Sequence, residues 1–386
     1  MRYMETKELM DWTSKQGRIL TCDGKATEYY TAERGFPFQP EELPHHYLIE
    51  GTTNEVFAKW AKEQNFNNPV CGAFFRPLFV GGFEHSTSAD EVTFNVQTNT
   101  LFIDIRIPLL GLKLLKDHKS FEAMSSDELS LYSRRHAFAG YTKLTEENGR
   151  PCCTRHHCMD WNFAGNPRPR PNKWYVEMAS NNNTWKEWSF ARDDHQQHYY
   201  WERWERLEND GGGNGFVLAM RKKRKNNQEM DGIIVAVGDH FNYIYGRDMY
   251  GKDVEAKGDS SVTVIDDALQ EEDRIKAMSF LSLSAGHGLI SNGWKVDCNL
   301  QQWKNGTRLF SADKVSVKGN DISSCEVEIG DERWEVYECN VDVKELEKIL
   351  KWRAGEGDTS GDTKEDAVEF KQILLGKKTG IKRKFE

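Results

Sequence analysis

The sequence predicts a mainly β protein built from two antiparallel β-barrels, with short helices at the termini and between strands. Three observations lead to this fold class. Short segments alternate apolar and polar side chains with a period of two, and turn-rich intervals separate them. Aromatic residues make up 12% of the chain, which suits pleated, half-buried surfaces. The length of 386 residues exceeds one ordinary domain and accommodates two barrels.

These patterns divide the chain into four expected regions. Residues 1–85 form a mixed α/β extension, and residues 86–250 form the first barrel. Residues 251–345 form a second, smaller β-barrel, and residues 346–386 form a C-terminal helix followed by a basic tail. The acidic and polar stretch 247–275 is the expected connection between the two barrels.

A strand is expected at 71–80, within the N-terminal extension, and the first barrel is expected to include a strand at 100–108. In the second of these, Leu101, Ile103, Ile105 and Ile107 lie on one face, whereas Phe102, Asp104 and Arg106 lie on the other. Ser125 and Glu128 then have capping-box spacing, which predicts a helix that includes His136 and stops at Gly140.

The remaining strands follow from alternation between turn signals. In the first barrel they are expected at 151–163, 173–178, 184–191, 198–207, 216–221 and 232–246. In the second they are expected at 275–285, 293–300, 307–310, 323–330 and 332–340. Helical spacing over 343–352, which ends near Gly355, predicts a final helix.

Composition excludes several function classes. A net charge of −9 argues against nucleic acid as the main partner, because phosphate contacts need a basic surface. No stretch approaches the ~20 apolar residues that span a bilayer. Residues 1–16 carry charges where a signal peptide needs an apolar run, and the 8 cysteines are scattered, so we expect a cytoplasmic protein. The basic run 377–384 fits a solubilising tail, a nuclear address or a contact with a protein partner.

Asp104 and Arg106 form the first candidate site, because they lie two residues apart on one face of a strand. An arginine fork can bind a carboxylate or phosphate, while the aspartate orients the ligand or accepts a proton. The competing interpretation is a structural ion pair or a solvated face. The opposite, aliphatic face is the natural core face if the sheet is buried on one side only.

A second candidate site follows from the parity of His156, Cys158 and Asp160, which places them together on one strand face. His156 and Asp160 can then act as a base and its orienting group, or as a structural hydrogen-bonded pair. His157 would face the other way. A metal would need a further ligand and no zinc spacing is present, so we expect neither a metal nor a cofactor.

Two further groups of residues could line a ligand pocket. Glu202 and Trp204 share a strand face with Tyr200 and Arg206, which fits either a pocket wall or cross-strand ion pairing. His240 follows an apolar run and would lie near a barrel mouth. The sequence has no nucleophile elbow, phosphate-binding loop, dinucleotide-binding fingerprint or zinc-protease motif.

Several of these segments together carry a family resemblance. The segments 102–108, 136–140 and 200–204 resemble a group of uncharacterised proteins with an Asp–Ile/Leu–Arg–Ile–Pro, Phe–Ala–Gly and Glu–x–Trp series. The segments 231–238, 280–288 and 334–340 are similar to fungal proteins built from two lipocalin-like β-barrels. The resemblance covers roughly residues 90–340 and implies the two lipocalin-like antiparallel barrels, without an activity.

We therefore expect a lipocalin-like protein that binds a small, anionic or carbonyl-bearing molecule in the first barrel. Trp161, Trp174 and Trp204 would wall the ligand, and Arg106 would fix its polar group. The alternative is a cofactor-independent lyase, isomerase or hydrolase in which His156 or Asp160 is the general base. The third hypothesis is a scaffold protein that binds another protein chain through its C-terminal tail. The sequence leaves open whether the protein is an enzyme.

Overall fold

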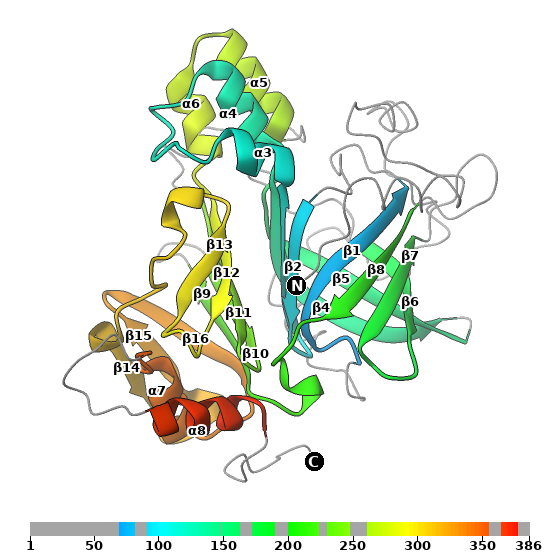
Figure 1. The fold of residues 1–386 in the computed structure, drawn as a ribbon, viewed down its shortest axis with the longest axis vertical. Helices are drawn as coiled ribbons and strands as arrows, with labels where there is room; N and C mark the ends of the chain where they lie inside the picture. Colours follow the sequence, from blue (N-terminus) through cyan, green and yellow to red (C-terminus); the bar gives the residue numbers. More distant parts are fainter. Residues whose placement is uncertain are drawn as a thin grey trace.

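The computed structural model describes residues 69–81, 91–147, 149–162, 172–189, 200–223, 230–247, 261–354 and 364–376. In these residues the chain forms two antiparallel sheets of eight strands each, one closed and one open (Figure 1). The mainly β fold class predicted from the alternating segments is confirmed. The expected extension over 1–85 and the basic tail over 377–386 lie largely or wholly outside the described residues.

The closed sheet is a barrel in which each strand pairs with its neighbour in sequence. Its strands are β1 (Gly72–Gly81), β2 (Glu91–Gln97), β3 (Leu101–Pro108), β4 (His136–Glu147), β5 (Arg150–Asp160), β6 (Asn172–Met178), β7 (Thr184–Ser189) and β8 (Tyr200–Arg206). The last strand, β8, pairs with β1 and so closes the sheet. Closure removes the unpaired strand edges that an open sheet exposes.

The second sheet is open, so the expected second barrel is wrong. Its strands are β9 (Val217–Lys223), β10 (Met230–Val237), β11 (His240–Tyr245), β12 (Ser284–Leu289), β13 (Lys295–Asn299), β14 (Val315–Lys318), β15 (Glu326–Ile329) and β16 (Glu332–Cys339). Their order is β13-β12-β11-β10-β9-β16-β15-β14. The strands β9, β10 and β11 were expected in the first barrel. Alternation identifies a strand but not its partners, and β9 pairs with β10 and β16.

Helices lie at two ends of the molecule (Figure 1). The helices α3 (Leu109–Leu114), α4 (Ser126–Ser133), α5 (Ser261–Gln270) and α6 (Arg274–Phe280) gather at the top. The helices α7 (Val343–Leu350) and α8 (Lys364–Leu374) pack on the second sheet. Short 3-10 turns occupy Gly211–Gly213, Gln302–Lys304, Ala312–Lys314 and Ile322–Ser324.

The helix predicted over 343–352 is confirmed by α7, whereas the helix predicted from Ser125 is confirmed at its start but not at its end. Ser125 and Glu128 form the predicted capping box of α4. However, α4 ends at Ser133, and His136 begins β4, which also contains Gly140. The strand expected over 275–285 is mostly α6, and the connection expected over 247–275 contains α5. The apolar residues of these short segments fit a strand or a helix equally well.

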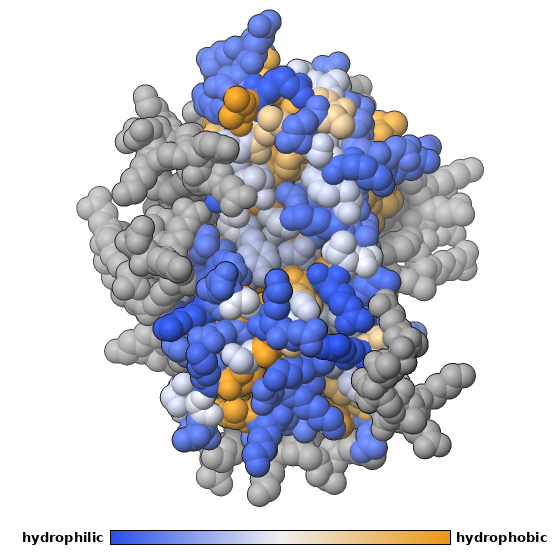
Figure 2. Space-filling model, turned by 90° about the vertical axis from the view of Figure 1, so that its left-hand side faces the viewer, coloured by the Kyte–Doolittle hydropathy of each residue, from blue (hydrophilic) through white to orange (hydrophobic). Residues whose placement is uncertain are grey.

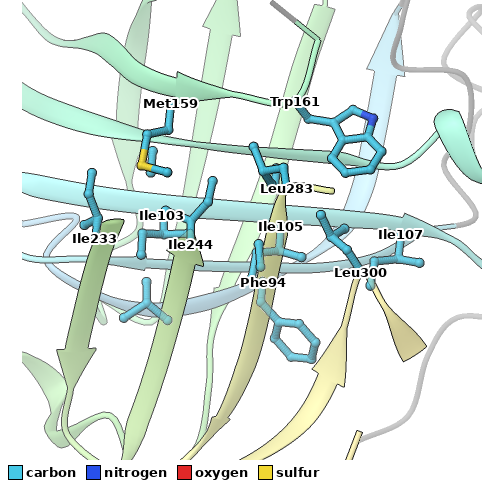
Figure 3. Close-up of a cluster of buried hydrophobic side chains, with 14 of the residues drawn as sticks. Phe94, Ile103, Ile105, Ile107, Met159, Trp161, Ile233, Ile244, Leu283 and Leu300 are labelled. Atoms are coloured by element: carbon cyan, nitrogen blue, oxygen red, sulfur yellow. The ribbon is translucent and has the colours of Figure 1, made fainter. Parts of the chain in front are cut away.

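The main hydrophobic core lies between the barrel and the second sheet (Figure 3). The outward side chains Ile103, Ile105 and Ile107 of β3 are fully buried there, with Ile233 and Ile244 from the second sheet. Burial of each such side chain contributes about 1.5–3 kcal/mol. The strand β3 is therefore buried on both faces, and its aliphatic face points away from the barrel interior.

Polar contacts also tie the two sheets together. The buried guanidinium of Arg247 donates from Nη1 to the carbonyl of Asp160 at 3.0 Å and from Nε to the carbonyl of Phe280 at 2.7 Å. Arg221 donates to the hydroxyl of Tyr141 at 2.5 Å. Buried carbonyl groups and hydroxyls need such partners. Side chains of the second sheet and its connections thus satisfy polar groups of the barrel.

The surface beside the second sheet is mostly hydrophilic, with hydrophobic areas at the top and the bottom of the view (Figure 2). Among the exposed apolar side chains, Ile275 of α6 is 67% exposed and Leu110 of α3 is 58% exposed. None of the helices in the described residues is long and apolar enough to cross a membrane.

Candidate binding site inside the barrel

The charged face of β3 points into the barrel. Asp104 and Arg106 alternate with the outward isoleucines, and both are buried. The Arg106 guanidinium reaches Glu202 of β8, at 3.3 Å from Nη1 to Oε1. Because β3 and β8 are not neighbours in the sheet, this contact crosses the barrel interior. The structure thus brings Asp104, Arg106 and Glu202 together in the barrel interior.

Three arginines and several carboxyl groups form one buried network in this interior. Arg106 donates to Asp104, with 2.9 Å from Nε to Oδ1. Arg76 of β1 donates to Glu202 at 2.8 Å and also pairs with Glu91. Arg155 of β5 lies 3.7 Å from Asp104 and donates to Gln97 at 2.7 Å. Every guanidinium of this network therefore already has a carboxylate partner.

The carboxyl groups of the network differ in their protonation. Burial would raise the pKa of Asp104, but the charges and hydrogen bonds of Arg106, with Arg155, lower it overall. Burial raises the pKa of Glu91 in spite of Arg76. Burial and the nearby Glu202 raise the pKa of Glu187 to about 8, so Glu187 carries a proton at neutral pH. Glu187 and Glu202 are direct cross-strand partners, which places the Glu202 carboxylate next to Glu187.

Aromatic side chains surround these charges. Trp174, Trp185 and Trp204 are buried in a small cluster inside the barrel, and the rings of Trp185 and Trp204 stack at 5.4 Å. The guanidinium of Arg106 lies 5.2 Å from the ring centroid of Phe138 and 5.9 Å from that of Trp204. Such contacts stabilise a buried cation. Trp174 and Trp204 thus lie where a ligand wall was expected.

Polar atoms without a hydrogen-bond partner collect in the same interior. Within the described residues they comprise three indole N–H groups, one guanidinium nitrogen and four side-chain oxygens: Trp174 Nε1, Trp185 Nε1, Trp204 Nε1, Arg155 Nε, Glu91 Oε1, Thr93 Oγ1, Asn95 Oδ1 and Glu202 Oε2. A buried polar atom without a partner costs about 1–3 kcal/mol. A packed core does not accumulate such atoms, whereas a site that binds a polar molecule or water uses them.

His157, and not His156, pairs with Asp160 in the barrel, so the expected geometry of this pair is wrong. Nδ1 of His157 lies 2.6 Å from Oδ2 of Asp160. The reason is a β-bulge between β4 and β5: Ala139 pairs with Met159, and the next residue, Gly140, pairs with His157. The extra residue, Cys158, reverses the parity of the strand.

The bulge places His156 on the outer face of β5. His156 is the register partner of Tyr141, which lies in the core outside the barrel. Burial, together with the neighbouring His157, lowers the pKa of His156 to about 3. Inside the barrel, His157 stacks on Phe138 at 4.6 Å, on the same ring that Arg106 contacts. The imidazole that lies near Arg106 is therefore that of His157.

Trp161 and His240 lie outside the barrel interior. Trp161 is buried in the core outside the barrel (Figure 3), and its indole N–H donates to the carbonyl of Ser133 at 2.9 Å. His240 begins β11 of the second sheet, and its Nε2 lies 2.6 Å from the carbonyl oxygen of Glu208. Neither side chain can wall a ligand in the first barrel.

Sequence reasoning missed Arg76, Glu91, Arg155 and Glu187. Alternation on β7 does place Glu187 on the same face as Trp185, so a signal was present there. Arg155 lies on the face of His157, which seemed to point outward. No group of three His, Cys, Asp or Glu side chains in the described part of the chain could hold a metal ion.

Comparisons with known proteins add little to this picture. No protein-family model matches the sequence, and no curated protein does. Among solved structures, the chain is similar to the uncharacterised protein YLR301w from Saccharomyces cerevisiae. The two are 13% identical with a TM-score of 0.40, over 69% of this chain and 98% of that chain. A likeness at this level supports no statement about a site or an activity.

Proposed function

We propose that the first barrel is a lipocalin-like binding site for a small, neutral molecule that carries carbonyl or hydroxyl groups. The observation that carries the proposal is the set of unpartnered indole N–H groups inside the closed barrel, beside arginines that already have carboxylate partners. Aromatic rings supply contact area, and a few placed polar groups fix orientation, as in small-molecule sites generally.

A neutral ligand is favoured over the anionic one that Arg106 first suggested. Arg76, Arg106 and Arg155 are each paired with a carboxylate. An anion would have to displace a carboxylate and would meet the remaining ones at low dielectric, which is costly. A carbonyl or hydroxyl oxygen needs only the indole donors, and a hydroxyl hydrogen can reach Glu202 Oε2 or Asn95 Oδ1.

A ligand screen with matched tryptophan variants tests the proposal. We expect saturable quenching of tryptophan fluorescence by neutral sugars, polyols or amides, and not by carboxylates of similar size. Trp185→Phe removes one donor but keeps an aromatic ring, so the affinity should fall about three- to tenfold, as for one lost hydrogen bond.

Trp334→Phe is the matched control for this screen. Trp334 is also fully buried and also has an indole nitrogen without a partner in the described residues, but it lies in the second sheet. It should therefore leave the affinity unchanged. Equal losses in the two variants, or no saturable quenching by any compound, would refute the proposed site.

A second candidate function is cofactor-independent acid–base catalysis, as a lyase, isomerase or hydrolase. It is favoured by one observation, the 2.6 Å contact between His157 and Asp160 inside the barrel. A carboxylate that orients an imidazole in this way can prepare it as a general base. Incubation of a ligand from the screen, followed by mass spectrometry, should then show conversion that His157→Gln abolishes and His156→Gln retains. A ligand that stays unchanged over long incubation would leave binding as the only function.

A further inference from the structure

A chain of hydrogen bonds runs from the barrel wall through Asn242 to two buried histidines of the second sheet. Asn242 of β11 donates from Nδ2 to the main-chain carbonyls of Phe94 (3.3 Å) and Ile103 (3.0 Å) in the barrel wall. Its Oδ1 lies 2.9 Å from Nδ1 of His287, the cross-strand partner on β12. Nε2 of His287 lies 3.4 Å from Nδ1 of His240, whose Nε2 contacts the carbonyl of Glu208.

The partners fix where the protons lie in this chain. Both amide hydrogens of Asn242 go to main-chain carbonyls, so its Oδ1 is an acceptor and Nδ1 of His287 carries a hydrogen. Nε2 of His240 likewise carries a hydrogen, because its partner is a carbonyl oxygen. In the uncharged pair, Nδ1 of His240 and Nε2 of His287 therefore carry no hydrogen, and their lone pairs face each other. One added proton would bridge these two nitrogens. A second added proton would have no acceptor, because the four ring nitrogens would then all be occupied.

The closed junction can thus hold at most one extra proton, whereas two imidazoles that turn apart into solvent when the junction opens take up two. A separated histidine protonates near pH 6.5. Acid therefore favours separation, because the state that binds more protons gains population as the pH falls. One proton of difference corresponds to a tenfold change in the open-to-closed ratio for each pH unit below about 6.5.

The surroundings oppose charging of the closed pair. Burial lowers the pKa of His240, and the carbonyl of Glu208 with the carboxylates of Asp239 and Asp210 offsets this only in part, while Lys371 adds to it. Burial and the charge of His240 also lower the pKa of His287. Asp297 is the further charged group nearby, and the ring of Phe94 stacks on His287 at 3.9 Å.

We propose that His240 and His287 form a proton-sensitive latch that holds β11 and β12 against β2 and β3 near neutral pH and loosens this contact in acid. The latch depends on the junction alone and needs no ligand in the barrel. The contacts of Arg247 and Arg221 lie elsewhere in the junction, so the latch releases one part of it and not the whole interface.

Hydrogen exchange of the full chain, read by mass spectrometry, tests the latch. Protection of peptides that contain β11 and β12, corrected for intrinsic exchange rates, should fall at least about tenfold from pH 7.5 to 5.5. In His240→Gln, the amide can donate to Glu208 and accept from a protonated His287. Open and closed states then each take one proton, and the acid effect should disappear.

His156→Gln is the control, because it removes another buried histidine, which belongs to β5 and not to β11 or β12; it should keep the full acid effect there. An equal fall in His240→Gln, or no fall in the native chain, overturns the proposal. Should His240→Gln fail to fold, nitrogen NMR of the native protein decides: the latch requires His287 to carry its proton on Nδ1 at pH 7.5, and a proton on Nε2 overturns it.

Discussion

The barrel and the second sheet each have eight antiparallel strands, yet their faces have opposite chemistry. The second sheet is apolar on both sides: Ile233 and Val235 face the barrel, and Ile234 and Ala236 lie in the other core. The barrel is apolar on the outer face that meets the second sheet and charged inside. Its stability therefore comes mostly from the outer face, while buried charges add little net stability. Interior charges that add little net stability are free to serve binding.

Removal of one arginine from the barrel network should lower the free energy of unfolding more than the other changes described below. In Arg106→Met, Asp104 and Glu202 lose a buried partner, so we expect a loss of about 3–5 kcal/mol in the free energy of unfolding, measured with urea. Lys351→Ala breaks the half-exposed pair with Glu347 on α7 and should cost less than about 0.5 kcal/mol. Similar costs for both variants would contradict the contrast between interior and surface.

Truncation on the other face of the same strand should cost slightly less. Ile105→Ala leaves a cavity in the core between the two sheets, and we expect a loss of about 2–5 kcal/mol in thermal or urea unfolding. Leu110→Ala, at a position that is 58% exposed, should stay within about 0.5 kcal/mol of the native protein. If Ile105→Ala is as mild as Leu110→Ala, the outer face does not carry the stability of the barrel.

Ionisation of Glu187 should change the free energy of unfolding by a smaller amount, which grows gradually with pH. Its pKa is raised from 4.5 to about 8 on folding, so the native state binds the proton that the unfolded state releases. Stability from this group is complete below pH 4.5 and is lost as the pH rises through about 8, by up to about 1.4 kcal/mol per pH unit.

Glu187→Gln should remove this dependence, because glutamine stays neutral at every pH. The variant should gain stability relative to the native protein between pH 5 and 9, as urea titrations at several pH values would show. A constant difference between the two proteins over this range would mean that Glu187 is ionised at neutral pH.

Strand parity predicted part of the candidate site and could not predict the rest. It correctly placed Asp104 with Arg106 and Glu202 with Trp204, since alternation within one regular strand depends on local geometry alone. It could not tell that the charged face of β3 is the inner one, because both faces are buried. That outcome depends on the second sheet, which covers the aliphatic face.

Alternation of apolar and polar residues could not predict which strands pair when they lie far apart in the sequence. Nothing near Phe216 indicates that β9 pairs with β16 more than a hundred residues later, so the open sheet was mistaken for parts of two barrels. The bulge in β5 was equally hidden, because it depends on the register between β4 and β5 and not on the composition of either.

The bulge between β4 and β5 determines which side chains of β5 point into the barrel and which point out. Gly140 permits it, since a Cβ at this position would lie 1.9 Å from the carbonyl oxygen of His156. Without the extra residue, His156 and Thr154 would turn inward, and Arg155 would leave Asp104 for the opposite face. One residue in the wall of the barrel thus decides which side chains β5 contributes to the interior.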